Sequence, residues 1–151
     1  SEMCIRDRTD GVDYTQCKFS DGQDLQGSYL PNSNLSFASF IQVNLDKSIM
    51  MNSNLAFGTF SESSFIRANL YESTLTGANF ELSNFSSANL TRADFMGATL
   101  IDVNFQNSNL MEANFTSSNI LNANFEGANL IGATWTNGEI CGPDSIGVCN
   151  K

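Results

Sequence analysis

Large apolar residues recur at every fifth position over most of this chain. From Leu25 to Trp135 there are 23 such positions without a gap, filled mainly by Leu and Phe. The residue two places before each of them is Ala, Ser or Gly at 20 of the 23 positions, and the residue one place before is most often Asn. We call the large apolar residue the centre of a five-residue unit. A short, constant period of this kind is typical of a solenoid built from internal repeats.

A period of five fits neither a continuous helix nor a continuous strand. In an α-helix, residues five apart are rotated by about 140° from a common face, and in a flat strand successive centres would alternate between the two faces. A chain that turns a corner every five residues points each centre, and the small residue two places earlier, inward. Asn favours such corners because its amide bonds to nearby backbone groups. The pattern predicts short extended sides joined by corners.

The order of Leu and Phe along the chain predicts four sides in each coil. At a spacing of 20 residues Phe tends to follow Phe, as in the column of Phe65, Phe85, Phe105 and Phe125. Such columns are expected if like side chains stack between neighbouring coils. The repeated region then forms about six coils of an all-β solenoid.

The unit resembles that of the pentapeptide-repeat family, in which a small residue, Asn or Asp, and Leu or Phe are followed by two variable residues. Segments 88–90 (Ala-Asn-Leu) and 123–125 (Ala-Asn-Phe) show it plainly. The resemblance covers residues 23–137, and its departures (Gln23, Tyr29 and Ile49) lie in the first two coils. It implies a right-handed, four-sided parallel β-helix.

The N-terminal end departs from the repeat. Residues 1–8 show no periodicity and resemble the translation of a sequencing-library adapter, so we interpret them as a non-native segment. Residues 9–22 are expected to form an irregular first coil, with one residue inserted around residues 20–23. Cys17 falls on a small inward position, where we expect a buried and unreactive side chain.

The tail over residues 138–151 is expected to cap the open strand edge of the last coil. It contains Cys141 and Cys149, for which we predict a disulfide that contributes about 2–3 kcal/mol. Free thiols and a metal site are the alternatives, although two thiols without His make an incomplete ligand set. The tail resembles the C-terminal caps of some exported members of the family. A disulfide would indicate the periplasm or the cell exterior, and free thiols the cytoplasm.

Composition narrows the function classes. The net charge is −9 and there is no His, so the chain lacks the clustered bases that phosphates require and the commonest general base. It also lacks an apolar stretch long enough to span a membrane. We therefore predict no enzyme activity, no cofactor, no metal, no direct binding of nucleic acid and no membrane span.

Function is then expected on outward positions, because the inward ones form the core. Glu72, Arg92 and Glu112 share one outward column, which predicts a ladder of surface ion pairs. Apolar outward side chains form stripes that mark a candidate partner surface, namely Met51, Tyr71, Met111, Ile131, Phe37 and Phe57.

We predict a non-catalytic scaffold or protein-interaction module whose partner is an unknown protein or, in a homodimer, a second copy. One alternative comes from the resemblance, since some family members act on DNA gyrase as acidic mimics of DNA. Residues 25–135, however, carry eight acidic and three basic residues and show no dense acidic stripe. The other alternative is an ice- or glycan-binding flat face, for which Thr76, Thr116 and Thr136 share a column that Met96 interrupts.

Overall fold

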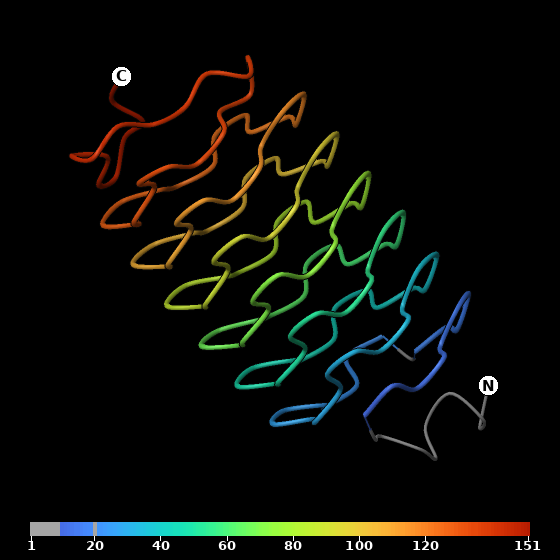
Figure 1. Cartoon of the computed structure of the whole chain (residues 1–151). Coiled ribbons are helices and arrows are strands. Elements are labelled where there is room, and N and C mark those ends of the chain that lie inside the picture. Colours follow the sequence, from blue (N-terminus) through green and yellow to red (C-terminus); the bar gives the residue numbers. More distant parts are fainter. Residues whose placement is uncertain (1–9, 20) are drawn as a thin grey trace.

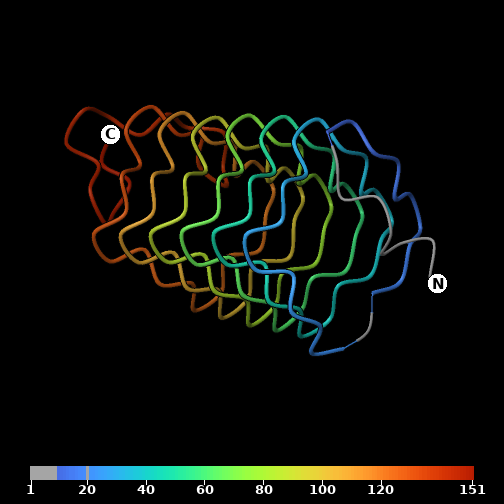
Figure 2. The same ribbon diagram turned by 90° about the horizontal axis from the view of Figure 1, so that it is seen from below.

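The computed structural model describes residues 10–19 and 21–151, and the segment interpreted as non-native lies outside that part of the chain. In the described part the backbone winds as a stack of coils that advances steadily from one end of the molecule to the other (Figure 1, Figure 2). This part contains no helix, and its β structure consists of single-residue bridges between coils. The predicted all-β solenoid is confirmed.

Parallel bridges set the register of the stack. From Asp24 and Asn44 onward, each bridging residue of the repeat pairs with the residue 20 positions later. Because the unit has five residues, four units separate one coil from the next, as the order of Leu and Phe predicted. The first coil differs, since Asp13 pairs with Asn34 at a separation of 21. The larger separation accommodates the extra residue predicted around residues 20–23.

Each corner is a tight turn that follows a centre. The N–H three residues after the centre donates a hydrogen bond to the centre's carbonyl, as from Ser48 to Leu45 at 3.1 Å. The residue two places after the centre has a φ between 54 and 72° at every corner from 27 to 132, which is the geometry a type II turn requires. Most of these corners hold residues other than Gly, including Phe57 and Leu82, for which left-handed backbone costs roughly 1–2 kcal/mol. Hydrogen bonds between coils hold the corners in this conformation.

The Asn before the centre caps the corner. The Oδ1 of Asn84 accepts a hydrogen bond from the Ser86 N–H at 2.9 Å, and the Oδ1 of Asp94 accepts one from the Met96 N–H at 3.0 Å. The same bond recurs at many other units. The predicted corner role of Asn is confirmed, and it explains why a residue unsuited to long strands is the commonest one at this position.

The centres form a dry column through the middle of the coils. Every centre from Leu35 to Phe115 has 0% exposure. In one column Phe65, Phe85 and Phe105 stack with ring centroids 4.6 and 5.5 Å apart. Rings of adjacent columns meet edge to face. The core is therefore continuous from coil to coil, as the spacing of Phe predicted.

Residues 138–151 fold back over the last coil, where the parallel register ends. Antiparallel bridges join Asn129 to Ile146 and Thr134 to Ile140. The direction of strand pairing thus reverses at this end, and the tail takes hydrogen bonds from the edge of the last coil that a further coil would otherwise take.

Candidate functional site

The described part of the chain presents columns of outward side chains and no pocket. No cavity opens to the surface in residues 10–19 and 21–151, and no three His, Cys, Asp or Glu side chains gather there to hold a metal ion. The same residues include no helix long and apolar enough to cross a membrane. Any contact that these residues make with a partner therefore involves the outside of the coils or the cap.

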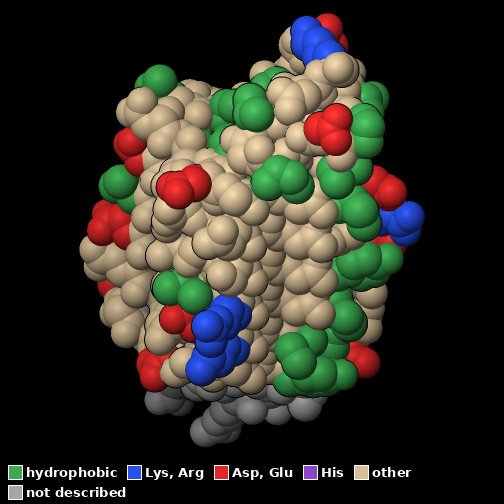
Figure 3. Space-filling view, turned by 90° about the vertical axis from the view of Figure 1, so that its left-hand side faces the viewer, with side chains coloured by type: hydrophobic (Ala, Val, Ile, Leu, Met, Phe, Trp, Pro, Cys, Tyr) green, Lys and Arg blue, Asp and Glu red, His purple; other side chains and the backbone are tan. Residues whose placement is uncertain are grey.

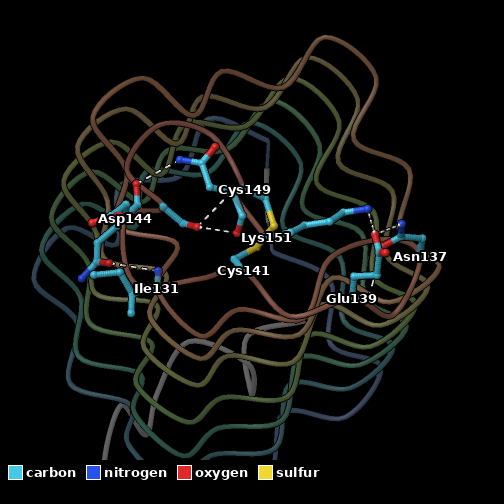
Figure 4. The surroundings of a disulfide bond; sticks show 10 residues. Ile131, Asn137, Glu139, Cys141, Asp144, Cys149 and Lys151 are labelled. Atoms are coloured by element: carbon cyan, nitrogen blue, oxygen red, sulfur yellow. Dashed lines mark hydrogen bonds and ion pairs between the residues drawn. A yellow bond between two sulfur atoms is a disulfide. The ribbon is translucent and has the colours of Figure 1, made fainter.

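The bonding of the cysteines agrees with the prediction at Cys141 and Cys149 and differs from it at Cys17. Cys141 and Cys149 are joined by a disulfide, the first of the three alternatives, with their Cα atoms 4.9 Å apart (Figure 4). The prediction for Cys17 was wrong, because its side chain is disulfide-bonded and only half-buried. Cys17 belongs to the first coil of the described residues, and among these residues only the following coil pairs with it, so an inward position there is less enclosed than in the middle of the stack.

A polar cluster fixes the end of the cap beside the disulfide (Figure 4). Lys151 forms an ion pair with Glu139, and the side-chain amide of Asn137 donates a hydrogen bond to the same carboxylate. The hydrogen bond from Lys151 is the main reason that the pKa of Glu139 lies below its ordinary value, and the one from Asn137 adds to the effect. The C-terminal residue is thereby held against the cap.

The predicted ion-pair ladder is present on one corner column. The Arg92 guanidinium lies 3.2 Å from the Glu72 carboxylate and 2.6 Å from that of Glu112. The hydrogen bonds that Arg92 donates to the two carboxylates, first to that of Glu112 and then to that of Glu72, raise the pKa of Arg92 further above its usual range. All three side chains are about half exposed, so solvent screens the pairs and each contributes little to stability.

The six residues of the candidate partner surface lie in two places. Met51, Tyr71, Met111 and Ile131 share a column, but each is half-buried, and Thr91 between them is buried. Phe37 and Phe57 protrude much further, with 57% and 55% of their surface exposed.

Phe37 and Phe57 form a stacked pair on the outside of the coils. Their ring centroids are 5.4 Å apart and their planes differ by 17°. The Phe57 ring also lies on Gly77, because a Cβ at that residue would approach the Phe57 Cε1 to 2.6 Å. The two rings therefore meet face to face, and more than half of the surface of each residue remains exposed.

The sequence of the repeated region decides the family. Residues 24–56, 63–100, 93–130 and 108–136 match the description of pentapeptide repeats, in eight copies. The chain belongs to the pentapeptide repeat family. The resemblance that the unit showed is confirmed.

Solved pentapeptide repeat structures resemble this one at low sequence identity. A trypsin-treated variant of QnrB1, a plasmid-mediated fluoroquinolone resistance protein, is 20% identical with a TM-score of 0.54, over 95% of this chain and 85% of that one. HetL from the cyanobacterium Nostoc sp. strain PCC 7120 is 19% identical with a TM-score of 0.38, over 87% of this chain and 88% of that one. AT2G44920 from the Arabidopsis thaliana thylakoid lumen is 24% identical with a TM-score of 0.36, over 77% of this chain and 67% of that one. No curated protein matches the chain. At these identities the likeness concerns the fold alone.

This pentapeptide repeat protein exposes further apolar side chains besides the six of the candidate partner surface. Tyr29 and Ile49, with 53% and 37% exposed, take the outward place where most units have Asn. The sequence signal for both is their departure from the unit. Leu82 and Leu121 are exposed as well, and so are three residues of the cap, namely Ile140, Ile146 and Val148.

Proposed function

We propose that this pentapeptide repeat protein is a non-catalytic scaffold or interaction module that binds a protein partner, or a second copy of itself, through its outward columns. The stacked pair of Phe37 and Phe57 is the observation that carries this proposal. Two large rings, each more than half exposed, are held side by side on a rigid stack. Aromatic side chains that are already ordered lose little entropy on binding and are enriched at the centres of protein interfaces.

The proposal extends to the handedness and the compartment. We infer a right-handed β-helix of about six coils, on the strength of family membership. We also infer an oxidising compartment, the periplasm or the cell exterior, which the disulfide between Cys141 and Cys149 and the bonded state of Cys17 support, because disulfides form and persist mainly in such compartments.

The two alternative functions gain no specific support. An acidic mimic of DNA needs a continuous negative stripe, whereas Arg92 stands between Glu72 and Glu112 on its column and pairs with both. A flat Thr face for ice or glycan needs an uninterrupted column, and Met96, 44% exposed, stands between Thr76 and Thr116.

Photo-crosslinking tests the proposed function. Benzoylphenylalanine replaces Phe57 in one variant and Ser87 in a control, since both residues occupy exposed corners with positive φ. We expect a discrete adduct with a protein of the source cells, or with a second copy, from position 57 only. Excess unmodified protein should suppress the adduct, and an excess of a variant carrying F37S and F57S should not. Equal adducts from both positions, or the same suppression by both competitors, would contradict the proposal.

A further inference from the structure

One side of the first coils combines apolar and basic side chains. This side runs from the corner at residues 27, 47 and 67 to the corner at residues 31, 51 and 71. Figure 3 shows Lys and Arg side chains near the lower end of the molecule, with hydrophobic side chains beside them. We call this area the basic–apolar face and define it by its outward residues Tyr29, Lys47, Ile49, Met51, Arg67 and Tyr71.

The exposed apolar side chains of the face contribute neither to the core nor to the capping of a corner. Tyr29 and Ile49 are bridge partners on neighbouring coils, so their exposed side chains lie next to each other. Asn at these positions would cap the following corner. Pro31 has no N–H to cap, which removes the need for Asn at position 29 but does not account for an exposed aromatic ring. Ile49 provides no oxygen for the Met51 N–H, so this unit gives up a corner bond that other units make.

The basic part consists of Lys47 and Arg67, which are exposed on successive coils of one corner column. Among the ion pairs of residues 10–19 and 21–151, none includes either side chain. The neighbouring Asp46 carboxylate is directed elsewhere, since it accepts a hydrogen bond from the Ile66 N–H at 2.9 Å. Two like charges in one column repel each other, so the pair does not stabilise the stack.

We propose that the basic–apolar face binds an extended acidic peptide segment with apolar anchors, contributed by a partner protein. This inference rests on the proposed function and names the chemistry of the partner. Lys47 lies at the corner and Ile49 on the short extended side that follows it, and both side chains are exposed, two residues apart in the chain. In an extended peptide alternate side chains point the same way, so a Glu set against Lys47 leaves the Leu two residues further on to meet Ile49. The chain as a whole has a net charge of −9 and repels an acidic segment, but the two basic side chains of this face attract one locally.

Other macromolecules fit the face less well. Anionic membranes are recognised by clusters of about 4–8 Lys and Arg, and this face has two bases in an acidic protein. A second copy docked through the same face would bring four like charges together. Two basic side chains in a protein of net charge −9 bind a phosphate backbone weakly, and Ile49 offers nucleobases no aromatic face to stack on. A peptide satisfies the charge and the apolar area at once.

Fluorescence anisotropy with a labelled peptide tests the proposal on the full chain. The probe is Ser-Glu-Ser-Leu-Ser-Glu-Ser-Leu-Ser, and its controls have Lys in place of Glu, or Ser in place of Leu. We expect saturable binding of the Glu–Leu peptide only, weakened by salt. The variant with K47E and R67E should lose at least about tenfold in affinity, because attraction becomes repulsion.

Replacing Tyr29 and Ile49 by Asn, the residue that most units have at this position, separates an effect on binding from an effect on folding. A variant with Y29N and I49N should lose the peptide while its melting temperature is unchanged or higher, because Asn is the residue most units have there. The matched control carries L82N and L121N, which remove exposed apolar side chains elsewhere and should leave the affinity unchanged.

The proposal is overturned if the Glu–Leu peptide does not bind, if the Lys peptide binds equally well, or if charge reversal has no effect. Binding to phosphatidylserine vesicles without binding to the peptide would overturn it in favour of a membrane, and concentration-dependent dimers lost in the Y29N and I49N variant would do so in favour of a second copy. If crosslinking from position 57 still succeeds, only this inference fails and the proposed function stands.

Discussion

At the scale of single residues, the small inward position is governed by hydrogen bonding as much as by volume. Ser and Ala alternate there almost freely, although a buried hydroxyl without a partner is unfavourable. The fold resolves this by offering carbonyls inside the coil. The Ser73 hydroxyl donates to the Met50 carbonyl and the Ser83 hydroxyl to the Phe60 carbonyl, both at 2.7 Å. Ser is therefore compatible with the dry interior wherever a centre's carbonyl is within reach.

Ser48 is the exception, and it supports a prediction. Its side chain is fully buried and its hydroxyl has no hydrogen-bond partner. We expect S48A to stabilise the protein by about 1 kcal/mol, because it removes an unsatisfied polar group. The matched variant S83A loses a satisfied bond and should destabilise by about 0.5–1.5 kcal/mol. Urea denaturation measures both. Equal destabilisation by the two variants would show that Ser48 has a partner in solution.

At the corners, the sequence predicted the role of Asn but not the left-handed backbone conformation. Asn before the centre was predicted as a corner residue because its amide chemistry is local. The positive φ two places after the centre was not, because residues such as Phe57 and Arg67 give no local signal for it. Hydrogen bonds between coils impose that conformation, as from the Phe57 N–H to the Thr76 carbonyl at 2.9 Å. A single unit could not supply this bond.

At the scale of one coil, inward and outward Phe side chains make similar stacks with different consequences. Phe85 lies between Phe65 and Phe105 and has 0% exposure. Phe57 also stacks on a neighbouring ring, but more than half of its surface faces solvent. Stability depends on the area removed from water and on the cavity left behind, so the shared stacking geometry does not make the two residues equivalent.

We therefore predict that F85A destabilises the protein by about 3–5 kcal/mol, the range for large buried aromatic residues. F57A should destabilise by only about 1 kcal/mol, because less than half of the surface of Phe57 is buried. Thermal and urea denaturation of the two variants provide the comparison. A similar loss from both would mean that the outer stack is part of the core.

One carboxylate of the cap makes the stability of the protein depend on pH. The pKa of Glu139 is lowered in the folded protein, first by the hydrogen bond from Lys151 and then by that from Asn137. A carboxylate with a lowered pKa contributes stability above its ordinary pKa of 4.5, and this contribution is lost as the pH falls through the lowered value.

We expect the stability difference between the wild-type protein and E139Q to be constant near neutral pH and to vanish as the pH falls below 4.5 toward the lowered pKa. Urea denaturation at a series of pH values measures this difference. The control is E81Q, which removes another carboxylate of the described surface. A difference that grows in acid would have the wrong sign and would exclude the ion pair with Lys151 as its cause.

At the scale of the whole molecule, the sequence predicted most where one contact repeats. The register of 20, the Phe columns and the dry interior follow from a period that is present 23 times. Prediction was weaker at the ends and on the surface, where contacts occur once. Cys17 was placed among buried residues because the unit was assumed to be equally enclosed everywhere. Met51 and Tyr71 were grouped with Phe37 and Phe57 as exposed, although the depth of a side chain on an outer column depends on its neighbours along the stack.

A stack held by contacts between adjacent coils opens from its ends, so the cap determines how the last coil behaves. The disulfide closes a loop between Cys141 and Cys149, and residues within this loop bond to the last coil. The Leu130 N–H donates to the Ser145 carbonyl and the Gly147 N–H to the Ala128 carbonyl, both at 2.8 Å. Without the crosslink these bonds would depend on a tail with far more conformational freedom.

We predict that the variant with C141S and C149S loses about 2–3 kcal/mol of stability, the loop-closure effect of a bond of this size. Hydrogen exchange should locate the loss, with faster exchange at the Leu130 and Gly147 amides and unchanged exchange at the Phe85 amide in the middle of the stack. The variant is preferable to a reducing agent, because a reductant would also act on the bond of Cys17. Uniformly faster exchange along the chain would instead mean that the coils unfold as one unit and that the cap stabilises all of them.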